Sequence, residues 1–310
     1  MAGADDDIVI LMMVYNHETL LAESLDSLLQ QTYQNFALLI VDDASTDRSF
    51  DVACGYRKKF KHCTLLRNDC NRGAVGNFHY SMRLIEQEFA QAQFFLLTSP
   101  DDTWSPQYLE NTRDTLLRNP AAVVCQSEYD MLFIKTGKKT THILRPLSAV
   151  SYRDARNVFY SHGSSDAKTH YNNMMHGLIR YSELRNIFPQ TRELLLSAQC
   201  VEISIMIAML LRGNMTVAEG VWYHKKKLGR FVDLHQNDEL TISFGKFGYR
   251  LNAVMRCLPW LLSINRTTST TTVLLLWTHL AYYYVFLLVA QRTRAACREL
   301  VKRADRLIRS

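Results

Sequence analysis

Four short apolar runs, each followed by polar residues, recur through the amino-terminal third of the 310-residue chain. Short apolar runs bounded by turn formers are typical of buried strands. The stretches between them have helical spacing; Leu21, Leu25 and Leu28, for example, share one face of a helix. Alternating strands and helices predict an α/β fold with a mostly parallel sheet flanked by helices. The predicted strands are Ile8–Val14, Phe36–Val41, Cys63–Leu66 and Phe94–Leu97.

Polar residues gather where these strands end. Asn16 follows the first strand, Asp42 and Asp43 the second, and Asp101 and Asp102 the fourth. The carboxyl ends of parallel strands meet at one edge of a sheet, where open α/β sheets bind ligands. Two adjacent aspartates can hold a divalent cation, which in turn can hold a diphosphate. The alternative for Asp101 and Asp102 is an ordinary acidic turn, because Asp is common in turns.

The second half of the chain continues with less regular elements. Residues 152–172 are polar and without periodicity, which is typical of a mobile loop over a site. The other expected elements are a helix over 106–118, a strand over 121–125, a hairpin turn at Thr136–Lys139, a helix over 202–212 closed by Gly213, and two short strands over 216–218 and 221–223.

Composition and charge exclude few functions. With 47% hydrophobic and 21% charged residues, the chain is an ordinary globular sequence. Its net charge of +6 lies mainly in residues 291–310, so it argues little for nucleic-acid binding by the body of the protein. Seven cysteines without a C-x-x-C pair indicate reduced thiols in the cytosol. The acidic start, Met1–Asp7, shows no signal-peptide pattern.

An apolar stretch and a basic tail end the sequence. Residues 273–290 are nearly all apolar, but they fall short of the roughly 20 residues that span a bilayer. We therefore expect an interfacial or re-entrant helix, paired with residues 257–264, and a basic helix lying on anionic headgroups. Residues 256–310 would then contact a membrane surface. The alternative is a helix buried by packing or in a dimer.

Four motifs in sequence order resemble those of the family 2 glycosyltransferases, which have the GT-A fold. The resemblance covers about residues 8–227, and the motifs follow one another at the family's spacing. They are Val14-Tyr15-Asn16; Ser27 to Phe36, with Gln31-Thr32-Tyr33; Val41 to Asp47, with Asp42-Asp43; and Asn71-Arg72-Gly73 with Asn77.

The resemblance implies that the ends of the first three strands bind a nucleotide-diphosphate sugar. Val14, Asn16 and Asp42 would belong to that site. Asp43 would accept a hydrogen bond from the base, which suits the N3–H of uracil or thymine and the N–H groups of guanine. A UDP-sugar is favoured. Arg72 would pair with a phosphate or with the edge of the base. The alternative for the two aspartates is helix capping.

The family's metal motif, Asp-x-Asp, is incomplete here because Ser99 stands in place of the first acid. The resemblance implies that Asp101 binds Mg²⁺ or Mn²⁺, with Asp102 in support and His224 as a third ligand. Ser99 would hydrogen-bond the ribose of the donor. For His224 the alternative is a purely structural role.

The resemblance also implies a catalytic base. The family places an acid at the start of a helix and a glycine eleven residues later, which is the spacing of Glu202 and Gly213. Glu202 would take the proton of the acceptor hydroxyl as it attacks the anomeric carbon, and one in-line displacement would invert that carbon. Lys225 would contact a phosphate. The alternative for Glu202 is an acid favoured by the helix dipole.

These features predict an inverting, metal-dependent hexosyl- or N-acetylhexosaminyltransferase of cell-surface polysaccharide synthesis. It would move one sugar to a hydroxyl of a glycan or lipid-linked glycan, at the inner face of the cell membrane. We expect a GT-A domain over 1–230, with donor (1–105) and acceptor (106–230) halves, and a membrane-associating helical segment over 231–310; a homo-oligomer is also compatible. Two rivals are a nucleotidyltransferase, although its Gly-rich phosphate loop is missing, and a non-catalytic nucleotide-sugar-binding scaffold, which Ser99 keeps open.

Overall fold

The computed structural model describes residues 6–134, 136–144, 146–147, 175–191, 205–206 and 208–227, together with residues 270, 273, 274 and 278. The predicted loop over 152–172 and the predicted base Glu202 lie outside these residues, as does most of the segment 231–310.

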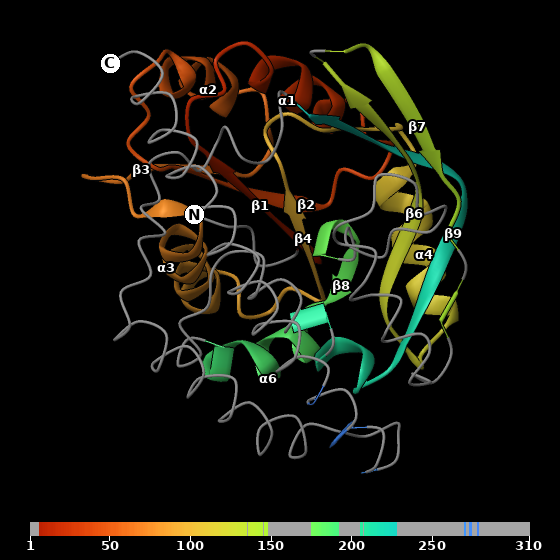
Figure 1. Cartoon of the computed structure of the whole chain (residues 1–310). Helices are drawn as coiled ribbons and strands as arrows, with labels where there is room; N and C mark the ends of the chain where they lie inside the picture. The colour runs from red at the N-terminus through yellow and green to blue at the C-terminus, as the bar shows by residue number, and fades with distance from the viewer. Residues whose placement is uncertain are drawn as a thin grey trace, which may run out of the picture.

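One mixed sheet organises the described part of the chain (Figure 1). Its strands lie in the order β3-β2-β1-β4-β8-β6-β9-β5, with β7 paired to β6. Strands β3, β2, β1 and β4 are parallel, as predicted, whereas β8 is antiparallel to β4 and β6. The strands are β1 Ile8–Val14, β2 Phe36–Asp42, β3 Cys63–Arg67, β4 Phe94–Thr98, β5 Thr103–Trp104, β6 Ala122–Phe133, β7 Lys138–His142, β8 Leu178–Arg180 and β9 Asn214–Lys227.

Helices cover both faces of the sheet. On one face, Ile8 and Ile10 of β1 pack in a cluster with α1 (Leu21–Leu29), α2 (Ser49–Arg57) and α4 (Tyr108–Arg118). On the other face, Val9 and Leu11 pack with α3 (Gly73–Glu88) and α6 (Tyr181–Thr191). Figure 1 shows α1 and α2 on one side of β1 and β2, with α3 and α6 on the other. Strands buried on both sides need apolar residues at every position, which explains the continuous apolar runs.

The register of the parallel strands brings their polar ends together. Val14 of β1 is level with Asp42 of β2, which is level with Arg67 of β3. Two residues that follow these ends, Asn16 and Ala44, adopt left-handed backbone conformations, with φ of 57° and 58°. The predicted gathering of polar loops at one edge of the sheet is therefore confirmed.

The carboxyl-terminal strands differ from the prediction. The two short strands predicted over 216–218 and 221–223 are one strand, β9, which runs parallel to β6. The pairing shifts between Ser127 and Glu128, opposite Ala218 and Trp222, and Gly220 has a φ of 72° at this irregularity. Residues 219–221 have no partner in β6 and interrupt the alternation of apolar residues in the sequence. The prediction therefore divided one strand into two, although its pairing with β6 continues beyond these residues.

The predicted hairpin is present between β6 and β7. The N–H of Gly137 donates to the carbonyl of Phe133 at 2.8 Å, and Gly137 has a φ of 66°. The strand that precedes it is longer than predicted, because β6 continues from the apolar residues 122–125 to Phe133.

Little of the predicted membrane segment is described. Val273 is fully buried in the cluster that contains α3 and α6, and Leu274 is exposed. None of the helices among the described residues combines the length and apolarity needed to cross a bilayer.

Candidate functional site

Asp43 is fixed at the end of β2 by groups from three neighbouring segments. Its backbone N–H donates to the carbonyl of Val14 at 2.8 Å. Its Oδ1 accepts hydrogen bonds from Asn68 Nδ2 at 2.7 Å and from the backbone N–H of Arg72 at 2.9 Å. The residue is 3% exposed. The carboxylate predicted to read the base therefore has a defined orientation.

Two buried asparagines support this carboxylate. Asn68 Nδ2 donates a second hydrogen bond, to Asn77 Oδ1 of α3, at 3.0 Å. The backbone N–H of Asn68 donates to the carbonyl of Asp42 at 2.8 Å. Asn68 is 6% exposed and Asn77 is 2% exposed. These contacts connect the second turn of α3 to the loops that follow β2 and β3.

The side chain of Asp42 is buried and is not exposed at the carboxyl edge of the sheet. Its Oδ2 accepts the N–H of Ser45 at 3.0 Å and lies 3.3 Å from Arg67 Nε. The residue is fully buried, and no described group donates to its Oδ1. These contacts shape the turn after β2, which is the capping-type alternative considered for this residue.

The loops that follow β1 and β2 hold each other in place. The N–H of Asn16 donates to Ser45 Oγ at 3.1 Å, and Asn16 Oδ1 accepts the N–H of Thr46 at 2.8 Å. Arg72 is exposed, and its guanidinium lies over the ring of Tyr80, 4.4 Å from the centroid. Arg72 therefore contacts Asp43 through its backbone N–H, while its side chain packs on Tyr80 of α3.

Asp101 and Asp102 have very different surroundings. Asp101 is partly exposed, and Ser99 Oγ donates a hydrogen bond to its Oδ1. Asp102 is fully buried and accepts hydrogen bonds from the Tyr223 hydroxyl and, at 3.1 Å, from the N–H of Lys226. Burial raises the pKa of Asp102 to about 7; the Lys225 ammonium 3.8 Å away opposes this rise, and Asp101 adds to it.

An aromatic and basic group surrounds Asp102. The Tyr223 ring packs against those of Trp104 and His176, with both centroids 5.9 Å away. His176 Nδ1 donates to the carbonyl of Leu97 at 3.2 Å, and its Nε2 lies 3.5 Å from Lys225 Nζ. Burial and the Lys225 charge hold the pKa of His176 well below its ordinary value, so the ring is neutral at pH 7. Lys225 thus lies between the carboxyl group of Asp102 and the neutral ring of His176.

His224 faces away from this group. Side chains alternate along a strand, so the neighbours Tyr223 and Lys225 reach Asp102 while His224 lies across from Asp130. His224 Nδ1 is 3.4 Å from Asp130 Oδ2. Among the described residues, no three His, Cys, Asp or Glu side chains converge as metal ligands.

The carboxylate oxygens of Asp101 and Asp102 determine how a cation could bind at this edge of the sheet. Both oxygens of Asp102 already accept hydrogen bonds, which leaves the partly exposed Asp101 as the carboxylate at this place. Mg²⁺ typically binds through one or two carboxylates together with substrate phosphates and water. A single carboxylate at the edge of the sheet suits that mode of binding.

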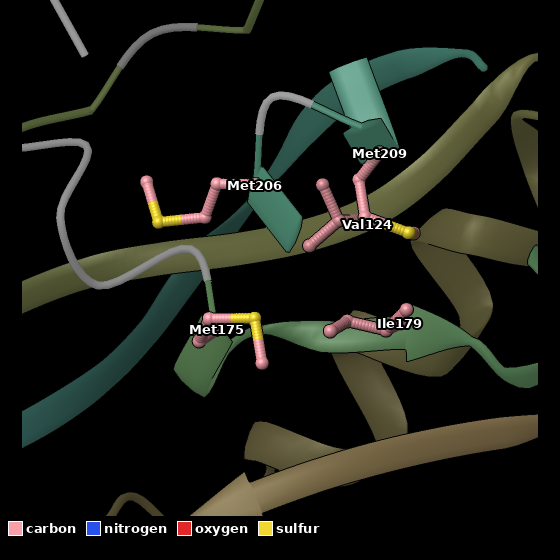
Figure 2. Close-up of a pocket in the computed structure, with 5 residues that line it drawn as sticks. All are labelled: Val124, Met175, Ile179, Met206 and Met209. Atoms are coloured by element: carbon pink, nitrogen blue, oxygen red, sulfur yellow. The ribbon is translucent and has the colours of Figure 1, made fainter. Parts of the chain in front are cut away.

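A second concave feature is apolar and lies elsewhere. Figure 2 shows the side chains of Val124, Met175, Ile179, Met206 and Met209 around a small gap. Apolar side chains line the gap, and it is too small to hold a water molecule. A nucleotide requires polar partners, so this space is a packing gap and not its site.

Comparison with known proteins identifies the family. The family model described as Glycosyl transferase family 2 matches residues 9–171, which is more than half of the chain. The chain belongs to glycosyl transferase family 2.

Curated members of glycosyl transferase family 2 match over shorter stretches. A poly(ribitol-phosphate) beta-glucosyltransferase of Bacillus spizizenii is 34% identical over 31% of this chain and 15% of its own length. The Escherichia coli enzyme WfgD, a UDP-Glc:alpha-D-GlcNAc-diphosphoundecaprenol beta-1,3-glucosyltransferase, is 33% identical over 37% of this chain and 43% of its own length. The chain thus matches less than half the length of each relative.

Solved structures match the fold over a larger part of the chain than the curated relatives do. Staphylococcus aureus TarS 1-349 in complex with UDP-GlcNAc superposes with a TM-score of 0.62, at 14% identity, over 90% of this chain and 72% of that one. The mannosyltransferase PcManGT of Pyrobaculum calidifontis, in complex with GDP-Man and Mn2+, gives a TM-score of 0.52 at 15% identity, over 94% and 73%. A curled mixed sheet flanked by helices is the GT-A fold, as the glycosyl transferase family 2 resemblance implied.

Sequence reasoning missed two groups of this family 2 site. The hydroxyl of Tyr223 was not expected to bind Asp102, because 121 positions separate the two residues. Asn68 was passed over although it directly follows β3, where a buried strand reaches the ligand edge. That position was the available signal for Asn68; for the bond between Tyr223 and Asp102 the sequence offers none.

Proposed function

We propose that the protein is an inverting glycosyltransferase that takes a single sugar from a nucleotide-diphosphate donor. The observation that carries this proposal is that Asn16, Asp43 and Asp101 follow three neighbouring parallel strands, β1, β2 and β4, at the carboxyl edge of the sheet, in the order of the family 2 motifs. The UDP-GlcNAc and GDP-Man held by two structural neighbours support a nucleotide-sugar donor.

The diphosphate would be held next to Asp101. Asp101 would bind Mg²⁺ or Mn²⁺ together with the phosphates, and the cation would neutralise charge on the leaving diphosphate. Ser99, which already donates to Asp101, would orient that carboxylate. Lys225 carries a positive charge beside Asp102 and would add electrostatic stabilisation.

Glu202 is proposed as the base that deprotonates the acceptor hydroxyl. It precedes the helical residues 205–206 and 208–210, and Gly213 ends that stretch against β6. At the start of the predicted helix over 202–212, the helix dipole would favour the charged form of a carboxylate, which suits a base. Attack from the face opposite the diphosphate inverts the anomeric carbon.

The acceptor is proposed to be a hydroxyl of a cell-surface glycan or of a lipid-linked glycan. The names of the two curated relatives, a poly(ribitol-phosphate) glucosyltransferase and a diphosphoundecaprenol-linked glucosyltransferase, support this class. Residues 256–310 would hold the protein at an anionic membrane surface. Vesicle flotation tests this: the full chain should bind anionic vesicles, and Arg298→Glu with Lys302→Glu should weaken binding. Equal flotation of both proteins would contradict the role of the tail.

Ser99 also leaves a second candidate, a scaffold that binds nucleotide sugars without turnover. A transfer assay that measures release of nucleoside diphosphate separates the two. The wild type should turn over, while Asp101→Ala and Glu202→Gln should each lose at least about 100-fold in kcat. Glu219→Gln, at an exposed position, is the control and should keep wild-type activity. Absence of turnover with every donor, despite binding, would favour the scaffold.

A further inference from the structure

From the contacts of Asp43 we infer that Asn68 and Asn77 select the base of the donor. They occupy one oxygen of Asp43 and leave the other as a single acceptor, which fits uracil or thymine and discriminates against guanine. The inference rests on the proposed function, because it assumes that a nucleotide donor places its base at Asp43.

The two oxygens of Asp43 differ in their hydrogen bonding. Oδ1 accepts from Asn68 Nδ2 at 2.7 Å and from the N–H of Arg72 at 2.9 Å. No described residue donates to Oδ2. The guanidinium of Arg72 lies over Tyr80 and leaves this oxygen free. Asp43 therefore offers one acceptor to a ligand, with its plane fixed by the two bonds on the other side.

Asp43 and Asn77 together fix which way the amide of Asn68 points. An amide nitrogen carries two hydrogens, and both are used here, one by Asp43 Oδ1 and one by Asn77 Oδ1 at 3.0 Å. The flipped amide would direct its carbonyl oxygen at a carboxylate and at another carbonyl, with no hydrogen between them. At 6% and 2% exposure, the two side chains have little water to compensate such a flip.

The bases differ in what one acceptor can satisfy. Uracil and thymine present a single N–H, at N3, between two carbonyl groups, so one oxygen pairs with it fully. Guanine presents two adjacent donors, at N1 and N2, and a carboxylate pairs with both only when both of its oxygens are free. Cytosine has an acceptor at N3, which Oδ2 would repel. A donor left unpaired in a closed site lowers affinity.

Calorimetric titration with four diphosphates tests the inference, each in the presence of Mn²⁺: UDP, dTDP, GDP and CDP. The wild type should bind UDP and dTDP at least about tenfold more tightly than GDP and CDP, the effect of one hydrogen bond to a charged group. Asn68→Ala removes one of the two hydrogen bonds to Asp43 Oδ1, and Asn77→Ala loosens the amide that makes it, so the ratio of the GDP and UDP dissociation constants should fall severalfold.

Ser81→Ala is the matched control. Ser81 lies one turn further along α3, is fully buried, and its hydroxyl has no partner among the described residues. This variant should keep the wild-type ratio, which separates base selection from general disturbance of α3. Thermal melts identify any variant that fails to fold, and the two asparagine variants give independent readings.

Each outcome decides between the claims. GDP binding as tight as UDP binding in the wild type would overturn the inference and leave the proposed function standing. A wild-type preference for UDP that persists in folded Asn68→Ala and Asn77→Ala would reduce the two asparagines to packing residues. If none of the four diphosphates binds, the proposed function itself fails.

Discussion

Aspartates at one edge of the sheet have different roles because their surroundings differ. Asp43 has one oxygen to which no described residue donates, Asp101 is partly exposed, and both oxygens of the buried Asp102 accept hydrogen bonds within the protein. The sequence shows only that these residues are acids after strands. Their division into ligand-facing and structural groups depends on distant partners such as Tyr223.

The bond between Tyr223 and Asp102 should contribute to stability. Tyr223→Phe keeps the ring but leaves a buried carboxylate with one donor fewer, so we expect the free energy of unfolding to fall by about 1–3 kcal/mol. Tyr181→Phe is the control, because the Tyr181 hydroxyl is buried with no partner among the described residues. Its loss should be neutral or stabilising. Equal destabilisation in urea melts would contradict this view of Tyr223.

The neutral state of His176 predicts a pH dependence of stability. Its pKa is lowered in the folded protein by burial and by Lys225, so below the ordinary value of about 6.5 the unfolded chain binds the extra proton. Stability from this residue is therefore complete above pH 6.5 and declines as pH falls towards the folded pKa.

His176→Gln removes this titration and provides the comparison. The wild type should lose stability relative to the variant by at most about 1.4 kcal/mol per pH unit between pH 6.5 and 5. Urea titrations at several pH values measure the difference. A difference that does not change with pH would show that the histidine titrates alike in both states.

At the scale of elements, close packing at the start of β9 depends on Gly213. A Cβ there would overlap Val123 Cγ1 and lie 2.7 Å from the carbonyl of Ala121. Gly213→Ala should therefore destabilise the protein by about 1–3 kcal/mol.

Gly55 offers the opposite case for comparison. It is exposed in α2, and a Cβ there meets nothing within 4 Å, so Gly55→Ala should stabilise by about 0.5–1 kcal/mol through helix propensity. Thermal melts of the two variants should shift in opposite directions. A shift in the same direction for both would mean that Gly213 is not tightly packed.

The elements themselves were largely predictable from periodicity. The runs that became β1, β2 and β4 are apolar at nearly every position because helices cover both faces. Periodicity failed at β9, where the irregularity around Gly220 divides one strand into two apparent ones. It also missed β5, because two residues are too few to form a pattern.

At the scale of the molecule, the four motifs from Val14 to Asn77 and the acidic pair Asp101 and Asp102 lie on the part of the chain that the family model covers, whereas Glu202 and Gly213 lie beyond it. Asp43, Arg72 and Asp101 could be placed from sequence because each directly follows a strand or begins a helix of the parallel half. Lys225 was also predicted from the resemblance, whereas the contact of Tyr223 with Asp102 arises only through the pairing of β9 with β5 and β6. Such pairings between distant segments leave no local signal in one sequence.

The central claim is that a nucleoside diphosphate binds at the carboxyl edge of this sheet with a cation held by Asp101. The most direct test is the melting temperature with UDP, GDP, dTDP or CMP, each with and without Mn²⁺, for the wild type and Asp101→Ala. We predict that at least one diphosphate raises the wild-type melting temperature by several degrees only with Mn²⁺, and that Asp101→Ala abolishes the rise. No stabilisation by any nucleotide, or equal stabilisation of Asp101→Ala, would contradict the account.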